Sequence, residues 1–514
     1  MLGETLSEFG EKTAVVDRGG SQSYAALDDA ATAVAHVLLD AGVEPGAVVA
    51  TVCPAGRWWL AGTFGIWRAG GVVLPLEPSH PPAELRHPVT DAAVTHVLCT
   101  KETSLLASQL AIFTGASVVD VPESLAAVGF SADWSTSRTS TTNTPSGQPA
   151  GLPHVDASSD AMIVYTSGTT GLPKGVVHTH RSLQAQCAAM VTAWGWSAND
   201  RILGVLPLHH IHGLVNVTFT PLTVGATLES AGGFDAVATW ERLASGEITV
   251  FMAVPTIYTR LIRAWTESDE ATRARWSEQA SNLRLMVSGS AALPVSTLEQ
   301  WRSLSGHLLL ERYGMTELGM ALGNSLERRV PGHVGWPFPG VEVRIINDRG
   351  TDADQGEVGE LLVRSDQVFD RYLHRPDATA ESFVDGWFRT GDVTQCTPEG
   401  YRLLGRASVD ILKTGGEKVS ALEIEEVFRT HPAIGDCAVV GVPDDDWGER
   451  VAMAWVAADD IESVAPVPTD GEFRTWGKER LAPAKVPFHY LRVDALPRNP
   501  MGKVTKTAVK DLFD

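Results

Sequence analysis

Apolar residues recur along the chain in short runs that alternate with helical patterns. After Ser23 they repeat about every 3.6 residues, at Leu27, Ala31, Val34 and Leu38. This period, with Ser23 as an N-cap and Gly42 just beyond the last turn, predicts an amphipathic helix. Runs rich in β-branched residues, such as 48–52 and 72–76, are separated by helical patterns and by Gly or Pro. Because parallel strands covered on both faces have this pattern, the chain is predicted to be α/β, with parallel or mixed sheets and flanking helices.

The alternation of apolar runs and helical patterns changes after about Gly405. The remaining residues predict a helix over 422–428, strands over 437–442 and 451–456, and a helix over 473–480, followed by a basic tail. This is enough chain for a small α+β domain. We therefore expect a large N-terminal domain, 1–406, and a small mobile domain, 407–514. Within the first, residues 135–153 are rich in Ser, Thr, Pro and Gly, which predicts a solvated loop.

Composition narrows the class of protein. Of 514 residues, 44% are hydrophobic and 20% are charged, which is typical of a globular protein. A net charge of −21 makes a nucleic-acid partner unfavourable. The five cysteines form no CxxC pair, so neither a disulfide framework nor a zinc site is predicted. Without a long apolar stretch or a secretory leader, we expect a cytoplasmic monomer or homodimer, or a mitochondrial matrix protein where a transit peptide has been removed.

The strongest local motif follows the apolar run 162–164. It is YTSGTTGLPKG, at residues 165–175. Its glycines and hydroxyl residues can turn backbone N–H groups and side-chain hydroxyls toward one anion, and Lys174 adds a positive charge. Gly168, Gly171 and Lys174 are evenly spaced and no Ser or Thr follows the lysine, so this is not the P-loop of a kinase or ATPase. The motif predicts a phosphate-binding loop of another kind.

With this motif and four others, the sequence resembles the adenylate-forming superfamily of acyl-CoA synthetases, luciferases and peptide-synthetase adenylation domains. The others follow in the superfamily's order: RYGMTE at 312–317, GWFRTGD at 386–392, GR at 405–406 and PRNPMGK at 497–503. The resemblance covers nearly the whole chain. It implies that a carboxylate attacks the α-phosphate of ATP to give an acyl-adenylate and pyrophosphate, after which the C-terminal domain rotates and a thiol takes the acyl group.

The same resemblance implies roles for individual residues. The ATP site would comprise Thr166, Ser167, Gly168, Thr169, Thr170, Lys174, Ser288, Gly289, Ser290, Ala291, Glu311, Arg312, Tyr313, Gly314, Met315, Thr316, Asp392 and Arg406. Within this set Tyr313 would stack on adenine and Asp392 would accept the ribose hydroxyls. Glu317 and Thr170 would hold Mg²⁺, which offsets phosphate charge. Lys503 would reach the forming acyl–phosphate bond, and Lys413, Gly415 and Gly416 would contact coenzyme A.

Two features bear on the acid that is activated. The run 282–288 predicts a strand, and Arg284 within a covered sheet needs an anion, from either a protein carboxylate or the substrate. His210 and His212 alternate with Ile211, so both would face one side of an extended segment. In acyl-CoA synthetases this segment borders the acyl pocket. A fatty or aromatic acid would leave such polar groups unpaired, whereas a diacid would not.

Three longer motifs resemble those of malonyl-CoA synthetases: VSGSAALP at 287–294, ERYGMTELGM at 311–320 and GRASVDILKTGG at 405–416. That resemblance implies that Arg284 and His212 hold the distal carboxylate of malonate or methylmalonate, that Met315 limits the pocket, that His210 is catalytic, and that coenzyme A is the acceptor. One extra residue after the GR motif leaves the domain pivot anywhere from Ser408 to Asp410. The alternatives are another acid, a carrier protein as acceptor, an inactive ATP-binding module and a luciferase-like oxidation.

Overall fold

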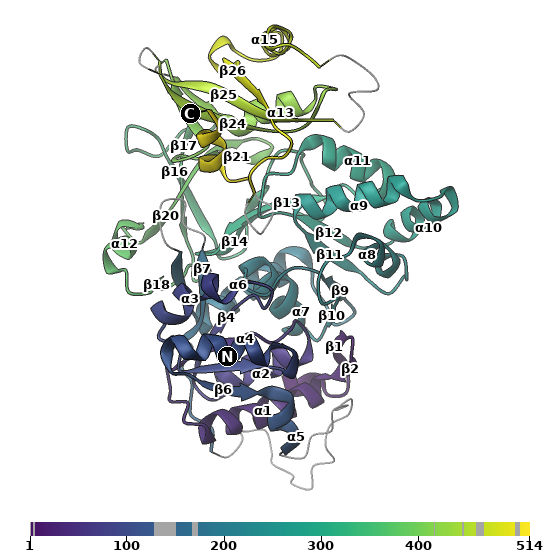
Figure 1. Ribbon diagram of the computed structural model, residues 1–514, viewed down its shortest axis with the longest axis vertical. Coiled ribbons are helices and arrows are strands. Elements are labelled where there is room, and N and C mark those ends of the chain that lie inside the picture. The colour runs from purple at the N-terminus through teal and green to yellow at the C-terminus, as the bar shows by residue number, and fades with distance from the viewer. Residues whose placement is uncertain are drawn as a thin grey trace.

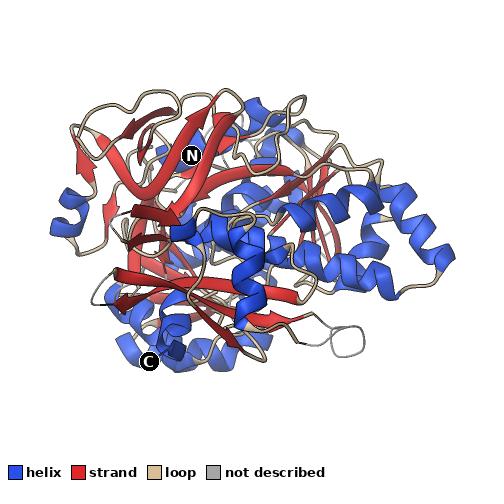
Figure 2. Ribbon diagram, turned by 90° about the horizontal axis from the view of Figure 1, so that it is seen from above, coloured by secondary structure: helices blue, strands red, loops and turns tan. Residues whose placement is uncertain are grey.

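The structure is a computed structural model that describes residues 2–3, 6–127, 151–166, 173–415, 417–444, 447–458, 467–498 and 504–513. The described strands form four sheets, two large ones in the N-terminal part and two smaller ones beyond residue 341. Figure 1 shows the C-terminal elements gathered at one end of the long axis, and Figure 2 shows the same molecule from above. The α/β fold class is confirmed.

The larger sheet has nine described strands and carries most of the candidate site. Its order is β15 (Trp336–Pro337), β14 (Gly319–Gly323), β13 (Leu310–Met315), β12 (Leu285–Ser288), β11 (Val250–Ala253), β9 (Arg201–Gly204), β10 (Thr227–Ser230), β1 (Thr13–Asp17) and β2 (Gly20–Ser23). The central pairs from β13 to β1 are parallel, and the edge pairs are antiparallel. The carboxyl ends of the central strands therefore lie along one side of the sheet.

The second sheet has seven described strands and carries the phosphate-binding motif. Its order is β18 (Arg371–Tyr372), β8 (Lys174–Thr179), β7 (Asp160–Thr166), β4 (Val72–Pro75), β3 (Val48–Thr51), β5 (His96–Cys99) and β6 (Ser117–Asp120). The predicted strands over 48–52, 72–76 and 162–164 are confirmed as β3, β4 and β7. The described ends of the motif lie at the end of β7 and the start of β8, which are antiparallel neighbours.

Helices cover these sheets and bury large aromatic side chains, among them Trp59 and Trp67. They are η1 (Leu6–Phe9), α1 (Tyr24–Asp40), α2 (Arg57–Arg68), α3 (Pro82–Asp91), η2 (Lys101–Thr103), α4 (Ser104–Thr114), α5 (Val121–Ala127), α6 (His180–Trp194), η3 (His212–Phe219), α7 (Thr220–Leu222), α8 (Ala236–Leu243), α9 (Pro255–Glu267), α10 (Glu270–Ala280), α11 (Val295–Ser305) and α12 (Pro376–Glu381). The predicted N-cap of α1 is confirmed, because the Ser23 hydroxyl accepts a hydrogen bond from the Ala26 amide at 3.1 Å.

A third sheet leads toward the C-terminal part. It comprises β16 (Glu342–Ile346), β17 (Val358–Arg364), β19 (Phe383–Val384), β20 (Trp387–Thr397) and β21 (Gly400–Arg406). The fourth comprises β22 (Ile411–Thr414), β23 (Glu417–Ser420), β24 (Ile434–Asp444), β25 (Gly448–Ala457) and β26 (His489–Arg492), with α13 (Ala421–Arg429), α15 (Asp470–Lys478), η4 (Pro483–Lys485), α16 (Lys506–Lys510) and η5 (Asp511–Phe513) beside it.

The C-terminal elements have apolar clusters of their own. Both clusters draw only on residues from Leu412 onward, while the larger clusters end before Arg406. The predicted helices over 422–428 and 473–480 correspond to α13 and α15. The domain boundary at 406–407 stays a prediction. Most of the predicted loop over 135–153 lies outside the described residues. In the described parts of the chain, no helix has both the length and the apolar character needed to cross a bilayer.

Candidate active site

Three parallel strands of the nine-stranded sheet end at the candidate site. The loop after β9 carries His210 and His212, β12 ends at Ser288, and β13 carries the RYGM part of its motif at 312–315. In open parallel sheets, ligands bind beyond the carboxyl ends of the strands. The order of strands thus explains why motifs about 100 residues apart in the chain come together at one edge.

The predicted ribose-binding residue Asp392 lies in a buried hydrogen-bond network. The Tyr313 hydroxyl donates to its Oδ2 at 2.5 Å, and the Arg406 Nε lies 3.2 Å from its Oδ1. Burial, followed by the Asp392 charge, raises the pKa of Tyr313 well above its usual value, so the phenol stays protonated as a donor. The three residues come from β13, β20 and β21, which fixes the carboxylate from two sides. This geometry is suited to accepting hydrogen bonds from a ribose.

Glu317 is the buried carboxylate next to this network. The Tyr372 hydroxyl donates to its Oε1 at 2.8 Å, and the Lys174 Nζ lies 5.0 Å from the centre of the Tyr372 ring. Burial raises the pKa of Glu317, although the Tyr372 hydrogen bond opposes that shift. Behind it, the His178 Nε2 donates to the Thr316 carbonyl at 2.8 Å. Tyr372 therefore contacts both Lys174, from the predicted phosphate-binding motif, and the Glu317 carboxylate.

This carboxylate fits the predicted Mg²⁺ site. In the described part of the chain, no group of three or more His, Cys, Asp or Glu side chains could form a metal cage. Mg²⁺ bound with a nucleotide commonly uses only one or two protein carboxylates and takes its other ligands from phosphates and water. One buried carboxylate, hydrogen-bonded to a tyrosine whose ring also faces Lys174, is that kind of donor set. Thr170, the other predicted ligand, lies outside the described residues.

Replacing Tyr372 tests the ionisation state of the Glu317 carboxylate. The Tyr372→Phe variant loses a hydrogen bond that favours the ionised form, so the pKa of Glu317 rises further. We expect the acidic limb of the Mg²⁺-dependent pyrophosphate-release profile to move to higher pH, with activity at neutral pH reduced by about tenfold or less. A profile that keeps its shape and falls uniformly would contradict this role.

A second polar cluster lies at the ends of β12 and β13. Arg312 is buried, its terminal nitrogen donates to the Ser290 Oγ at 3.4 Å, and the His212 Nδ1 lies 3.1 Å from the same oxygen. The Arg312 Nε and the His212 Nε2 are buried and have no hydrogen-bond partner among the described residues. Burial lowers the pKa of Arg312 to about 9, and burial followed by the Arg312 charge keeps the pKa of His212 well below its usual value.

The backbone is shaped to make room for this guanidinium. A Cβ placed on Gly289 would lie 2.3 Å from the Arg312 Nε, so only glycine allows the strand end to pass so close. The next residue, Ser290, has a φ of +69°, which is strained for a residue with a side chain. Ser290 and Ala291 are exposed, so the buried cluster opens to solvent on their side. Strained backbone at such a position is frequent at ligand sites.

Arg284 does not belong to this cluster, and the prediction that it awaits a substrate carboxylate is wrong. Its Nε and one terminal nitrogen bond both oxygens of Asp200 at 2.6 and 2.8 Å, and its other terminal nitrogen donates to the Trp194 carbonyl at 2.8 Å. The predicted strand over 282–288 is shorter than expected: β12 begins at Leu285 and ends at Ser288. Arg284 precedes it, at the end of the strand opposite the site.

The predicted geometry of the two histidines is also corrected. The segment at 210–212 is not extended, because Ile211 has φ −53° and ψ −32° and the helical element η3 begins at His212. His212 is buried and His210 is half-buried, but the Nε2 of each ring is enclosed, and the electrostatic influence of His210 on the pKa of His212 places the two rings near each other. The two side chains are brought together by a turn entering a helix rather than by strand alternation.

The remaining predicted residues are distributed as follows. The Glu311 carboxylate accepts the Gly332 amide at 2.8 Å, and burial raises its pKa to about 8. The Ser288 hydroxyl is buried without a partner among the described residues, and the Met315 sulfur lies 3.7 Å from the Tyr313 hydroxyl.

The other predicted residues are located only by their elements. Thr166 ends β7, Gly314 lies within β13, and Lys413 and Gly415 lie on or beside β22. Outside the described residues are Ser167, Gly168, Thr169, Thr170, Gly416 and Lys503.

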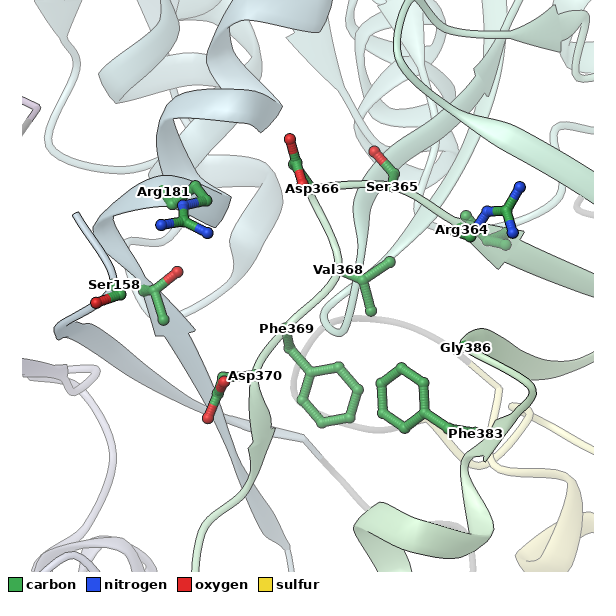
Figure 3. A pocket seen from close by; sticks show the side chains of 12 residues that line it. Ser158, Arg181, Arg364, Ser365, Asp366, Val368, Phe369, Asp370, Phe383 and Gly386 are labelled. Atoms are coloured by element: carbon green, nitrogen blue, oxygen red, sulfur yellow. The ribbon is translucent and has the colours of Figure 1, made fainter.

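A separate cavity of about 360 Å³ lies behind the Glu317 segment. Figure 3 shows Phe369 and Phe383 facing each other there, with Arg181 and Arg364 on opposite sides. The Phe369 amide donates to the Glu317 carbonyl at 2.7 Å, so one wall of the cavity supports the buried carboxylate. None of the predicted site residues lines this cavity.

Comparison with known proteins agrees with the motifs. Residues 2–373 match the family described as AMP-binding enzyme, and residues 423–503 match the AMP-binding enzyme C-terminal domain. The chain belongs to the AMP-binding enzyme family. The predicted resemblance to adenylate-forming enzymes is thereby confirmed. The match to a separate C-terminal family lies within the part of the chain that holds its own apolar clusters.

Several members of the AMP-binding family are similar over nearly their full length. The mitochondrial malonate–CoA ligase of Mus musculus is 43% identical, over 97% of this chain and 88% of its own. The malonate–CoA ligase of Arabidopsis thaliana is 38% identical, over 97% of this chain and 86% of its own. The crystal structure of ATP-bound MatB from Rhodopseudomonas palustris superimposes with a TM-score of 0.87 at 31% identity, covering 100% of this chain and 99% of that one.

Sequence reasoning missed two features of this AMP-binding enzyme. It grouped Arg312 only with the nucleotide site, although the guanidinium contacts Ser290, which His212 also contacts. It also missed Tyr372, which reaches Glu317 from a two-residue strand 55 positions later in the chain. A tyrosine in so short a strand carries no sequence signal. A signal for Arg312 would have been a predicted strand over 310–315, because an arginine within a covered strand requires an anion.

Proposed function

We propose that this protein is an AMP-forming malonate–CoA ligase, which converts malonate, ATP and coenzyme A to malonyl-CoA, AMP and pyrophosphate. The observation that carries the proposal is the buried guanidinium of Arg312, which has no carboxylate partner among the described residues. The similar malonate–CoA ligases support the same substrate. Methylmalonate, with one additional methyl group, is a candidate for the same pocket.

The charge of Arg312 selects for a diacid. A buried charge without a partner costs several kcal/mol, and a charge-assisted hydrogen bond returns about 1.5–3 kcal/mol. The distal carboxylate of malonate would supply two acceptor oxygens to the Arg312 fork, with His212 and Ser290 beside it. A monocarboxylic acid would leave the guanidinium unpaired and would therefore bind more weakly than a diacid. Met315, half-buried in the same motif, would limit the length of the acid.

The reaction places the other carboxylate of malonate near the nucleotide. One of its oxygens attacks the α-phosphorus of ATP, a new P–O bond forms, and the bond to the β-phosphate oxygen breaks, releasing pyrophosphate. Asp392, held by Tyr313 and Arg406, would fix the ribose, and Lys174 would contact the departing phosphates. Glu317 would hold Mg²⁺, which would neutralise charge on those phosphates. Lys503 would stabilise the charge that develops at the α-phosphate.

The second step needs a thiol. The sulfur of coenzyme A attacks the acyl carbon of the adenylate, the acyl–phosphate bond breaks, and AMP leaves. We propose that residues 407–514 move as a unit between the two steps, pivoting between Ser408 and Asp410, and that Lys413, Gly415 and Gly416 then line the path of the thiol. We propose the cytoplasm as the compartment, with the mitochondrial matrix as the alternative that the name of the mouse relative suggests.

A panel of acids tests the proposal. Purified protein with ATP, Mg²⁺ and coenzyme A is assayed for pyrophosphate release with malonate, methylmalonate, succinate, acetate, octanoate and benzoate. We expect malonate to give the highest kcat/KM, exceeding acetate by about 10²-fold or more, because only the diacid pairs with Arg312. A preference for any monocarboxylic acid would overturn the assignment of substrate and leave an acid–CoA ligase of other specificity.

A further inference from the structure

Two loops from different sheets meet beside the acyl end of the site. Glu77, just after β4, lies with its Oε2 3.0 Å from the His209 Nδ1 in the loop after β9. Neither side chain is fully exposed, with 21% and 16% of their surfaces accessible. The Ser79 hydroxyl donates to the other Glu77 oxygen at 3.0 Å. Burial tends to raise the pKa of Glu77, but the hydrogen bonds from His209 and Ser79 and the His209 charge lower it overall.

The His209 ring in turn packs on His210. The ring centres are 3.8 Å apart, and the planes are inclined by 49°. The edge of His80 contacts the other side of the cluster, with its ring centre 5.1 Å from that of His209. The His210 Nε2 is buried and has no partner among the described residues. Burial, followed by the His209 charge, lowers the pKa of His210 to about 3, although the Glu77 charge opposes this shift, so the imidazole is neutral near pH 7.

These contacts form a path from Glu77 through His209 to His210. His212 follows two residues later in the chain, and the electrostatic influence of His210 contributes to lowering its pKa. His212 contacts Ser290, which contacts Arg312. Only the inner end of this path belongs to the proposed malonate site. The outer carboxylate and His209 touch neither the proposed substrate cluster nor the nucleotide residues described above.

We propose that Glu77 and His209 are positioning residues for acid activation, holding the ring of His210 so that its buried Nε2 faces the substrate carboxylate. This inference rests on the proposed function, since it assumes that an acid is activated beside His210. A ring packed against a partner that is itself anchored to a carboxylate loses its rotational freedom before the substrate arrives. Because the anchor joins loops from two sheets, it also fixes the distance between those loops.

Four variants test the positioning role. Glu77→Gln removes the charge and keeps the size, His209→Phe keeps a ring on His210 and removes the bond to Glu77, and a third variant combines both. Glu84→Gln is the matched control, because Glu84 is a more exposed carboxylate whose nearest histidine contact is His80 at 3.7 Å. We expect the first two to lower kcat for malonate-dependent pyrophosphate release by about tenfold, with KM for ATP within about twofold of the wild type.

The double variant shows whether the two single substitutions lower kcat by breaking one shared hydrogen bond or through two independent effects. Because both substitutions break the same hydrogen bond, the double variant should be no slower than the slower single variant. Glu84→Gln should retain the wild-type kcat. Losses that multiply in the double variant, or a Glu77→Gln variant that behaves like Glu84→Gln, would overturn the proposal. Thermal unfolding of each variant identifies any loss that comes from instability.

A pH profile shows whether the loss in Glu77→Gln arises beside His210 or at Glu317. The titratable or charged groups that face this path are Glu77, His80, Glu84, His209, His210, His212 and Arg312. Because burial holds the pKa of His210 at about 3, its imidazole stays neutral through the acidic limb assigned above to Glu317, so Glu77→Gln should lower kcat by the same factor across the profile and leave that limb in place. A limb that moves in Glu77→Gln, as it should in Tyr372→Phe, would place the effect at Glu317 and count against the proposal. If wild-type protein does not activate malonate, the proposed function fails, and the same comparison with whichever acid it does activate decides the positioning role separately.

Discussion

Arg312→Met is expected to lower kcat/KM for malonate by about 10²- to 10³-fold, because truncating one partner of a buried, hydrogen-bonded charge pair costs roughly 2–5 kcal/mol. The same variant should retain or gain activity with propionate, whose methyl group would occupy the place of the distal carboxylate. KM for ATP should change little. Pyrophosphate release with both acids, measured across concentrations of acid and ATP, checks these three results.

Thermal unfolding of this variant provides an independent test. In the protein without substrate, the Arg312 guanidinium is buried and the described residues offer it no carboxylate. Replacing such a charge with an apolar side chain of similar length removes a desolvation cost, so Arg312→Met should unfold at a higher temperature than the wild type. Arg312→Lys, which keeps the charge without the two-pronged geometry, should recover malonate activity only in part. A less stable Arg312→Met protein that still prefers malonate would contradict the role of Arg312.

Arg284→Ala should have the opposite effects to Arg312→Met: the protein should be less stable, and its preference for malonate should not change. It removes the partner of Asp200, whose side chain is only 3% exposed, and leaves that carboxylate buried. We expect a loss of about 2–4 kcal/mol in the free energy of unfolding, the range for a charged hydrogen-bonding group left without its partner. The preference for malonate over acetate should stay as in the wild type. Urea unfolding and the acid panel measure the two outcomes.

The loss of unfolding free energy in Arg284→Ala should depend on pH, because it depends on the ionisation of Asp200. Burial opposes ionisation of Asp200, but the hydrogen bonds from Arg284 and the Ser197 amide and the Arg284 charge lower its pKa overall. Its stabilisation is therefore fully present above the unfolded pKa of about 3.9 and is lost as pH falls through the folded value. The gap in stability between wild type and Arg284→Ala should narrow below about pH 4. The exposed pair Arg275 and Glu241 is the matched control, and its loss should change stability little. A gap that is equal at pH 7 and pH 3 would contradict the ion-pair account.

The two arginines illustrate where sequence reasoning stops. An arginine within a covered strand requires an anion, and from the sequence alone only Arg284, in the predicted strand over 282–288, is expected to meet this condition. The structure shows that the same requirement applies to Arg312, which lies in β13. Arg284 precedes β12, whereas Arg312 lies in β13 beyond Leu310 and Glu311, toward the carboxyl side of the sheet. Four strand residues span about 13 Å, so the position of Arg284 at the start of β12 is remote from the ligand edge. The predicted strand over 282–288 begins three residues before β12, and this error in its first residue placed Arg284 inside the sheet.

Partners distant in sequence account for the other differences. Asp200 is 84 residues from Arg284, and the two meet because the parallel neighbours β9, β11 and β12 begin at the same side of the sheet. Tyr372 reaches Glu317 only because β18 pairs with β8 at the edge of the other sheet. No local pattern encodes either contact, since register and strand order arise from the packing of the whole sheet.

The sequence alone determined the family and the α/β class, and it predicts the nucleotide-binding residues, because phosphate and ribose binding depend on short motifs in which neighbouring residues act together. It also determined that some buried cation would need an anion. Only the tertiary structure decided which guanidinium is already neutralised by the protein and which remains without a carboxylate among the described residues. The physical reason is that charge pairing depends on distances across the sheet, which are set by strand order and direction rather than by separation along the chain.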